Sequence, residues 1–77
     1  MPDRIRRMKS REVEAILSRH GFRLVSQQGS HRKWRHLQKR VQVIVPEHAG
    51  RDLPLGTLRI IFVNAEIPES EWRRLGR

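Results

Sequence analysis

The spacing of the apolar residues changes at Gly21, and this change restricts the chain to a mixed α and β fold. Before Gly21, Val13, Ile16 and Leu17 recur at the spacing of one helix face. Ser10 is a suitable N-cap residue for that helix. Gly21 suits the left-handed position that often follows the end of a helix. We therefore predict a helix that starts near Ser10 and ends before Gly21.

Short runs separated by turn residues follow, and they predict three strands. The runs are FRLVSQ (22–27), HRKWRHL (31–37) and VQVIVP (41–46), the last of which ends at a proline. The turns between them, QGS and LQKR, are short. Short connections join antiparallel strands, so we expect an antiparallel meander.

A second helix is predicted after Pro54, a residue that can open a helix. Four apolar residues fall on one face of it: Leu58, Ile61, Phe62 and Ala65. The β-branched run RIIFV would also suit a strand, but the helical spacing and the lack of turn residues favour a helix.

The opposite side of this second helix is also apolar and holds Ile60, Val63 and Ile67. One interpretation is that a short last helix, PESEWRRL (68–75), covers this side with Trp72 and Leu75. The other is a protein interface. We favour the covering helix, because large exposed apolar patches are uncommon on monomers.

The expected fold class is therefore α+β, in the order α-β-β-β-α, with a short C-terminal helix. The simplest packing places both long helices on one face of a three-stranded antiparallel sheet and leaves the other face open. This is the order of a fold similar to the double-stranded-RNA-binding domain (dsRBD-like). We expect residues 1–8 to be a flexible basic extension and residues 9–77 to form a single domain. Translation could also start at Met8.

The charge distribution predicts a polyanion as the ligand. Seventeen basic and eight acidic residues give a net charge of +9, and no acid lies between Glu14 and Glu47. That acid-free stretch holds seven bases: Arg19, Arg23, Arg32, Lys33, Arg35, Lys39 and Arg40. Such a concentration is typical of nucleic-acid binders, although a solvated basic face without a ligand remains the alternative. The absence of cysteine excludes thiolate chemistry, and no apolar run approaches a membrane span, so we expect a cytoplasmic protein.

The segment around His31 is the candidate site. Strand alternation places His31, Lys33 and Arg35 on one face and Arg32, Trp34 and His36 on the other. Since Trp34 is the bulky apolar residue, its face should be the core, with Arg32 and His36 reaching out at the sheet margins. The His31 row then lies on the open face, directly after Gly29, which permits close approach of a polyanion, and Ser30, which adds a hydroxyl donor.

These residue types suit RNA cleavage without a metal ion. RNA carries its own nucleophile, the 2′-OH, which a neutral imidazole can activate while Lys33 and Arg35 stabilise charge on the phosphate. No carboxylate cluster near the segment could hold a metal ion. Alternatively, His31 is only a phosphate contact. His48 is a possible second acid or base, or a loop histidine that hydrogen-bonds the backbone, and His20 and His36 are expected to be structural.

The sequence resembles the HicA toxins of bacterial and archaeal toxin–antitoxin pairs from Met8 to about Trp72. The resemblance rests on four short motifs in the family's order: a helix that ends in HGF, GSH followed by an aromatic residue, VPEH, and LPLGTLRII. One departure is Glu66, because family members usually carry a glycine after the second helix.

The resemblance implies a small mRNA interferase with the α-β-β-β-α fold, silenced by a HicB-type antitoxin. It implies that the histidine of GSH, His31, is catalytic, and it places Gly29 and Ser30 in the same motif. Our reading of the residues adds Arg32, Lys33 and Arg35 as RNA-binding residues. The predicted partners are mRNA and the antitoxin, with no cofactor and no metal. The alternative is a non-catalytic RNA-binding module, and a DNA-binding regulator is less favoured because no helix-turn-helix is apparent.

Overall fold

The structure, a computed structural model, describes residues 7–68, 70 and 71. Two helices flank a three-stranded sheet in the chain order α1 (Ser10–Arg19), β1 (Phe22–Gln28), β2 (His31–His36), β3 (Val41–Pro46) and α2 (Leu55–Asn64). The α-β-β-β-α order predicted from the sequence is thus confirmed. The run RIIFV lies within α2, so the strand alternative for this segment is wrong.

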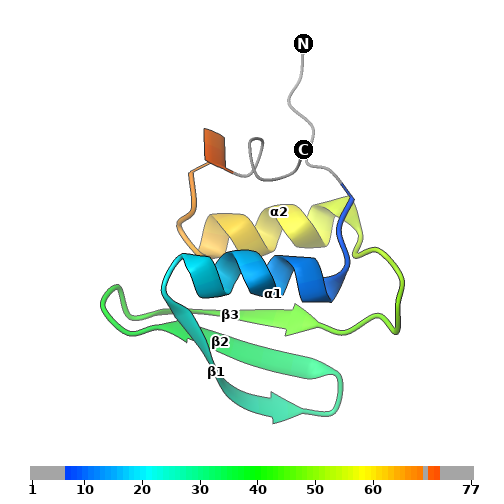
Figure 1. The fold of residues 1–77 in the computed structure, drawn as a ribbon, viewed down its shortest axis with the longest axis horizontal. Coiled ribbons are helices and arrows are strands. Elements are labelled where there is room, and N and C mark those ends of the chain that lie inside the picture. Colours follow the sequence, from blue (N-terminus) through cyan, green and yellow to red (C-terminus); the bar gives the residue numbers. More distant parts are fainter. Residues whose placement is uncertain (1–6, 69, 72–77) are drawn as a thin grey trace.

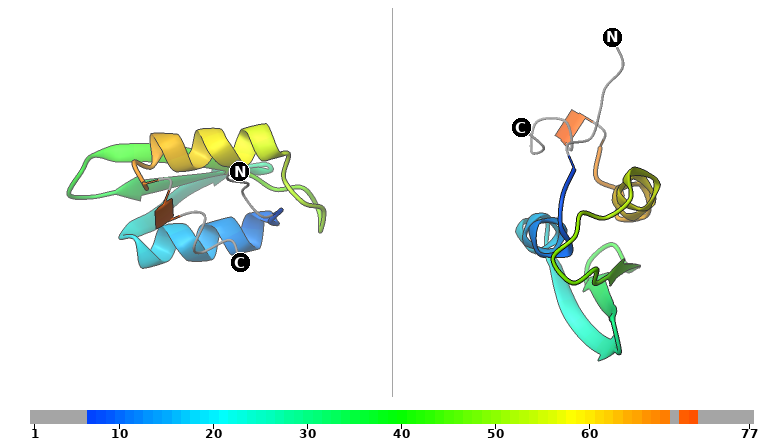
Figure 2. Two further views of the ribbon diagram at one scale, coloured as in Figure 1. Left: turned by 90° about the horizontal axis from the view of Figure 1, so that it is seen from above. Right: turned by 90° about the vertical axis from the view of Figure 1, so that its right-hand side faces the viewer.

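The sheet is antiparallel in the order β1-β2-β3. Helices α1 and α2 lie side by side over one face (Figure 1), and the end-on view in Figure 2 shows that no helix covers the other face. The predicted open sheet face is therefore present. Strand β1 is the edge strand farther from α2, and it extends beyond the helices in both figures.

The strand register determines which side chains share a face. Along β2, Arg35 lies between Arg23 of β1 and Gln42 of β3, whereas Trp34 lies between Leu24 and Val43. A bulge interrupts the β1–β2 pairing, because Leu24 pairs with Trp34 and Ser26 with Lys33, which leaves Val25 without a partner. Beyond the bulge, Gln28 pairs with His31.

The core lies between the helices and the sheet, and β3 contributes most to it from the sheet. Its buried apolar residues among those described are Met8, Val13, Ile16, Leu17, Phe22, Val43, Val45, Leu53, Leu58, Ile61, Phe62, Ala65 and Ile67. From β1 only Phe22 is buried, and Leu24 is 43% exposed. The core is therefore concentrated under β3 and the adjoining part of β2, where both helices cover the sheet.

Met8 corrects the expected boundary of the domain. It is fully buried, and its carbonyl oxygen accepts a hydrogen bond of 2.8 Å from the backbone N–H of Leu53. Lys9 forms an isolated β-bridge with Asp52. Residue 8 is thus part of the folded domain rather than of an extension, while residues 1–6 lie outside the described part of the chain.

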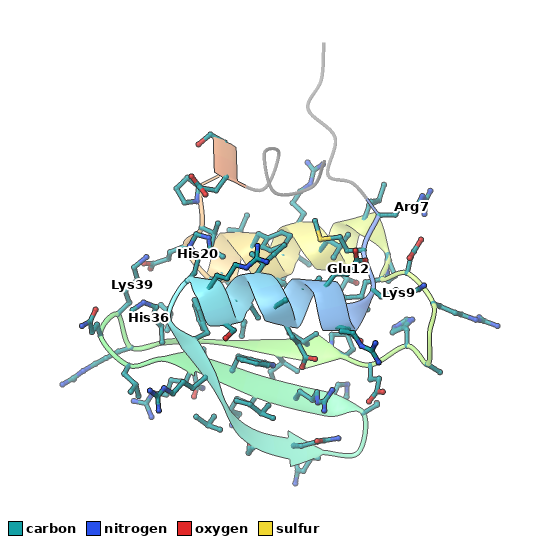
Figure 3. The ribbon with its side chains drawn as sticks, in the orientation of Figure 1. Arg7, Lys9, Glu12, His20, His36 and Lys39 are labelled. Atoms are coloured by element: carbon teal, nitrogen blue, oxygen red, sulfur yellow. The ribbon has the colours of Figure 1, made fainter. Side chains whose placement is uncertain are left out.

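The ends of α1 differ slightly from the prediction. The N-cap is Lys9 rather than Ser10, and the backbone N–H of Lys9 donates to Oε1 of Glu12 at 3.0 Å. At the other end, Gly21 has a φ of 91°, the left-handed conformation predicted for it. Lys9 and Glu12 lie together at the start of α1 in Figure 3.

The two sides of α2 differ in their burial. All four residues predicted on its inner face are buried, and Ile67 is buried as well. Ile60 and Val63 are 61% and 57% exposed. Of residues 68–75, position 69 and positions 72–75, with Trp72 and Leu75, lie outside the described residues. Over the described range, no helix combines the length and apolar character needed to span a membrane.

Candidate nucleic-acid interface

A tight turn places His31 at one end of the open face. Gly29 and Ser30 form the turn between β1 and β2, and Gly29 has a φ of 58°, a conformation that favours glycine. An added Cβ at Gly29 would meet no atom within 4 Å, so the space above the turn is open. The backbone N–H of Glu47 donates to the carbonyl oxygen of Ser30 at 2.8 Å. This bond ties the turn to the loop that follows β3.

Three rows of side chains cross the open face from β1 through β2 to β3, and we call each row a rung. The rungs are Gln28–His31–Pro46, Ser26–Lys33–Ile44 and Arg23–Arg35–Gln42. Lys33 and Pro46 are partly buried, and the other members are exposed. The predicted row of His31, Lys33 and Arg35 therefore exists and runs through the middle of all three rungs.

No carboxylate lies on these three rungs. None of His31, Lys33 and Arg35 has an acidic partner within 4 Å among the described residues. Ile44 is 51% exposed and lies beside Lys33, so an apolar surface adjoins the cations. This combination suits a polyanion that also presents flat apolar groups, as unpaired nucleotides do.

The helix-facing side of β2 carries a buried carboxylate that the sequence did not indicate. Glu14 of α1 is 9% exposed and accepts a hydrogen bond from Nε1 of Trp34 at 2.8 Å. Its other oxygen accepts from Nη1 of Arg32 at 3.3 Å. Glu14 thus fastens the middle of β2 to α1, and the indole and the guanidinium are oriented toward the helix.

Arg32 lies apart from the other predicted RNA-binding residues. Its side chain is 31% exposed, its Nε is buried without a hydrogen-bond partner, and its charge is paired with Glu14. The structure places Gly29, Ser30 and His31 at one end of the open face, with Lys33 on the next rung. Arg32 faces the opposite side of the sheet, so it does not join that group.

His36 is buried rather than displayed at a margin, which corrects the expectation for its side chain. It is 9% exposed, and its ring lies edge-on to Phe22 with the centroids 5.2 Å apart. Its Nδ1 accepts a hydrogen bond from the backbone N–H of Lys39 at 3.1 Å. Figure 3 places His36 and Lys39 at the end of the molecule opposite Lys9 and Glu12. These contacts account for the structural role that we predicted for His36.

His48 lies in the loop after β3. In Figure 1 this loop lies on the same side of the molecule as the turn between β1 and β2. His48 is exposed, and its carbonyl oxygen accepts from the backbone N–H of Arg51 at 2.8 Å. Its neighbour Glu47 is bonded to Ser30. The loop therefore brings His48 into the neighbourhood of the His31 turn, which the sequence alone did not establish.

Two surface hollows of about 460 and 500 Å³ lie away from His31. One is lined by Gly21, Phe22 and His36 among others, and the second by residues at the start of α1 together with Arg32. His31 lines neither of them. The open face suits a polymeric ligand better than the hollows do, because a polymer binds along a surface and needs no enclosed pocket. Among the described residues, no group of three or more histidine and acidic side chains could hold a metal ion.

Two residues of the open face were missed from the sequence as candidates, Arg23 and Gln42. Both become candidates through the register, because they flank Arg35 on the neighbouring strands. The basic stretch included Arg23 but gave no information on its neighbours in space. Only the pairing of strands places it beside another arginine.

The comparison with known families supports the resemblance noted in the sequence. A family model described as "HicA toxin of bacterial toxin-antitoxin" matches residues 10–67. The matched segment includes both helices, all three strands and the GSH turn. A search of curated proteins found no match to the chain.

Proposed function

The chain belongs to the HicA family of toxins from bacterial toxin–antitoxin pairs, and we propose that it is an endoribonuclease that cleaves mRNA in the cytoplasm without a metal ion. Toxins of this family are generally ribonucleases. The observation that carries the proposal is the position of His31, exposed at a glycine turn on an open face with Lys33 and Arg35 in the same row.

His31 is the acid–base residue of the proposed reaction. Its imidazole takes the proton of a ribose 2′-OH, and the 2′-oxygen attacks the adjacent phosphorus. The bond from phosphorus to the 5′-oxygen breaks, and that oxygen receives a proton. The products are a 2′,3′-cyclic phosphate and a 5′-hydroxyl. The proton for the leaving oxygen comes from the His31 imidazolium or from His48, whose loop is bonded to Ser30 through Glu47.

Lys33 and the turn hold the scissile phosphate. Lys33 is two residues from His31 on the same face, so its ammonium group stabilises negative charge on the phosphate as the 2′-oxygen attacks. Gly29 lets the RNA backbone approach the turn, and Ser30 offers a hydroxyl donor. A single positioned acid–base group contributes about 10²–10⁴-fold to a rate, so we expect slow turnover, which suits growth arrest better than digestion.

The partner that we propose is a HicB-type antitoxin with an acidic surface. A chain of net charge +9 with an open basic face is complementary to such a surface. Occlusion of His31 by the bound antitoxin is the simplest form of inhibition. The family match supports a partner of the antitoxin kind.

A non-catalytic RNA-binding module is the competing function, since the same basic face would bind RNA without cleaving it. Its binding would weaken as salt concentration rises, with no strand scission. One experiment separates the two functions. Wild type and His31→Ala are compared on one labelled RNA in EDTA, and cleavage and binding are both measured, with His20→Ala as a control at the histidine that caps the end of α1.

For a ribonuclease, we expect His31→Ala to bind RNA normally and to lose at least about 100-fold in cleavage rate. Wild type and His20→Ala should cut equally and leave 2′,3′-cyclic ends. His48→Ala tells whether the second histidine supplies the leaving-group proton. Binding without cleavage by wild type would identify a binding module, and 3′-hydroxyl products would contradict the mechanism.

A further inference from the structure

The rung farthest from His31 places two arginines directly opposite each other. Arg23 of β1 and Arg35 of β2 are paired residues on the open face, and Gln42 of β3 continues the rung. All three side chains are exposed. Directly opposed residues on one face of an antiparallel pair have Cβ atoms about 4.5–5.5 Å apart. The two guanidinium groups can therefore reach a common point above the sheet.

This pairing is unfavourable without a ligand. Like charges directly opposite each other destabilise a sheet. Neither arginine has a carboxylate partner within 4 Å among the described residues, and the adjacent rung adds a third cation, Lys33. By contrast, Arg32 on the other face has its counter-charge in Glu14. An anion between Arg23 and Arg35 would relieve the repulsion, and a phosphate accepts hydrogen bonds from both forks.

The position of the rung matches the path of an RNA strand that is cut at His31. Arg35 is four residues from His31, about 13 Å along β2, and Lys33 lies at half that separation. At that separation Arg35 is better placed for another phosphate of the strand than for the scissile one. On the side of His31 away from Arg35 the sheet has no further rung, because β2 begins at His31 and the chain turns there through Gly29 and Ser30.

The middle rung offers a surface for unpaired bases. Ile44 is 51% exposed beside Lys33. A base can lie on this aliphatic group only when it is not paired with another strand. The arrangement thus favours single-stranded RNA over a duplex.

We propose that Arg23, Arg35 and Gln42 form a phosphate subsite that holds single-stranded RNA on one side of the scissile phosphate. This proposal rests on the proposed function of the His31 turn and adds to it a second point of attachment. Arg23 and Arg35 bind one phosphate jointly, and the side-chain amide of Gln42 donates a further hydrogen bond. The RNA therefore needs nucleotides on one side of the cut and gains little from nucleotides on the other.

Binding is tested in the His31→Ala background, where cleavage does not interfere. Arg23→Ala and Arg35→Ala are added singly and together, and Arg59→Ala on α2 is the matched control, because Arg59 is exposed and on the helix side of the molecule. The affinity for a single-stranded RNA is measured over a range of salt concentrations. Circular dichroism checks that each variant is folded.

We expect Arg23→Ala and Arg35→Ala each to weaken binding several-fold and to reduce the slope of log affinity against log salt by about 0.7, the value for one phosphate of a single strand. The double variant should lose little more than either single variant, because the two residues share one phosphate. Arg59→Ala should change neither quantity. The single variant Arg23→Ala, with His31 intact, should cleave long RNA less efficiently than wild type does. It should cleave a short RNA that is cut near its end as efficiently as wild type.

Equal affinities for Arg23→Ala and Arg59→Ala, in a protein whose wild type cleaves RNA, would overturn this subsite and leave the proposed function intact. Fully additive losses would overturn the shared phosphate. If Arg23→Ala weakened only the binding of an acidic antitoxin, the rung would be a protein contact and the proposal would be wrong. Absence of both RNA binding and cleavage in wild type would remove the proposed function and this subsite together.

Discussion

Replacing Glu14 by alanine would remove the acceptor that two side chains of β2 share. Trp34 Nε1 donates to one carboxylate oxygen at 2.8 Å, and Arg32 Nη1 donates to the other at 3.3 Å. Glu14 is 9% exposed, so water cannot easily take its place. Both donors would then lack their protein acceptor in a partly buried space between α1 and the sheet.

The cost can be estimated from these contacts. Leaving the partly buried indole N–H unsatisfied costs about 1–3 kcal/mol. The Arg32 ion pair adds about 0.5–1 kcal/mol, because the guanidinium side chain is 31% exposed and solvent screens it. We therefore expect Glu14→Ala to lower the free energy of unfolding by about 2–3 kcal/mol. For a domain of this size that corresponds to a fall in Tm of about 10–20 °C.

Thermal and urea unfolding followed by circular dichroism would measure this loss. Glu47→Ala is the matched control, because Glu47 is an exposed glutamate whose backbone, not its side chain, makes the bond to Ser30. Glu14→Gln keeps an acceptor for Trp34 and should lose only about 1 kcal/mol. A double-mutant cycle of Glu14→Ala with Trp34→Phe, which removes the N–H, should give a coupling of about 1 kcal/mol.

The reasoning would be refuted if Glu14→Ala were as stable as Glu47→Ala, or if the effects of the Glu14 and Trp34 changes were additive. The first result would mean that water satisfies both donors as well as the carboxylate does. The second would mean that the destabilisation comes from packing around the Glu14 side chain rather than from its hydrogen bonds.

Two further predictions concern residues with left-handed backbone conformations. Gly21→Ala should destabilise the fold by about 1–3 kcal/mol, because φ is 91° and the new Cβ would lie 2.9 Å from Nε2 of the buried His36. Urea unfolding would measure this loss. A loss below about 0.5 kcal/mol, the usual range for surface changes, would contradict the prediction. Glu66→Gly should instead raise Tm, because Glu66 has a φ of 60° directly after α2 and glycine adopts this conformation without strain. Relief of the left-handed strain is worth about 1–2 kcal/mol, and the greater freedom of glycine in the unfolded chain offsets about 0.4–1 kcal/mol of it. An unchanged or lower Tm would contradict this balance.

The two faces of the sheet have different roles: the helix side contributes to stability, and the open side is the proposed RNA-binding surface. Residues on the helix side of β2, such as Trp34 and His36, make the contacts that hold the strand against the core. Lys33 and Arg35 lie on the opposite side of β2, by alternation along the strand, and Figure 2 shows that no helix covers that face of the sheet. Substitutions on the helix side should therefore change stability, and those on the open side should change RNA handling with little change in Tm.

The order and extent of the elements followed from the sequence because local rules determine them. Strand β3 begins and ends at the predicted residues, Val41 and Pro46, since turn residues precede it and proline ends it. The buried face of α2 followed from its helical spacing, and alternation placed His31 on the open side of β2. The likeness to HicA toxins rested on motifs of consecutive residues, and the family match agrees with it.

Contacts between the helices and strands could not be predicted from such local patterns. Met8 lies in a short basic segment outside the predicted helices and strands, so no periodicity marks it as part of the core. Glu14 lies within the helix predicted from the sequence, but its burial depends on how α1 lies over Trp34 and Arg32. The exposure of Ile60 and Val63 likewise depends on what packs against α2.

The sequence by itself thus determined the α-β-β-β-α order, the alternation that exposes His31, and the concentration of basic residues in the middle of the chain. Only the tertiary structure decided that Arg23 lies opposite Arg35, because this depends on the register of β1 against β2 and on the bulge at Val25. The physical reason is that hydrophobic periodicity and turn preference depend on residues that are close in the chain. Strand register and helix packing instead decide which residues far apart in the chain become neighbours, and so which charges lie side by side.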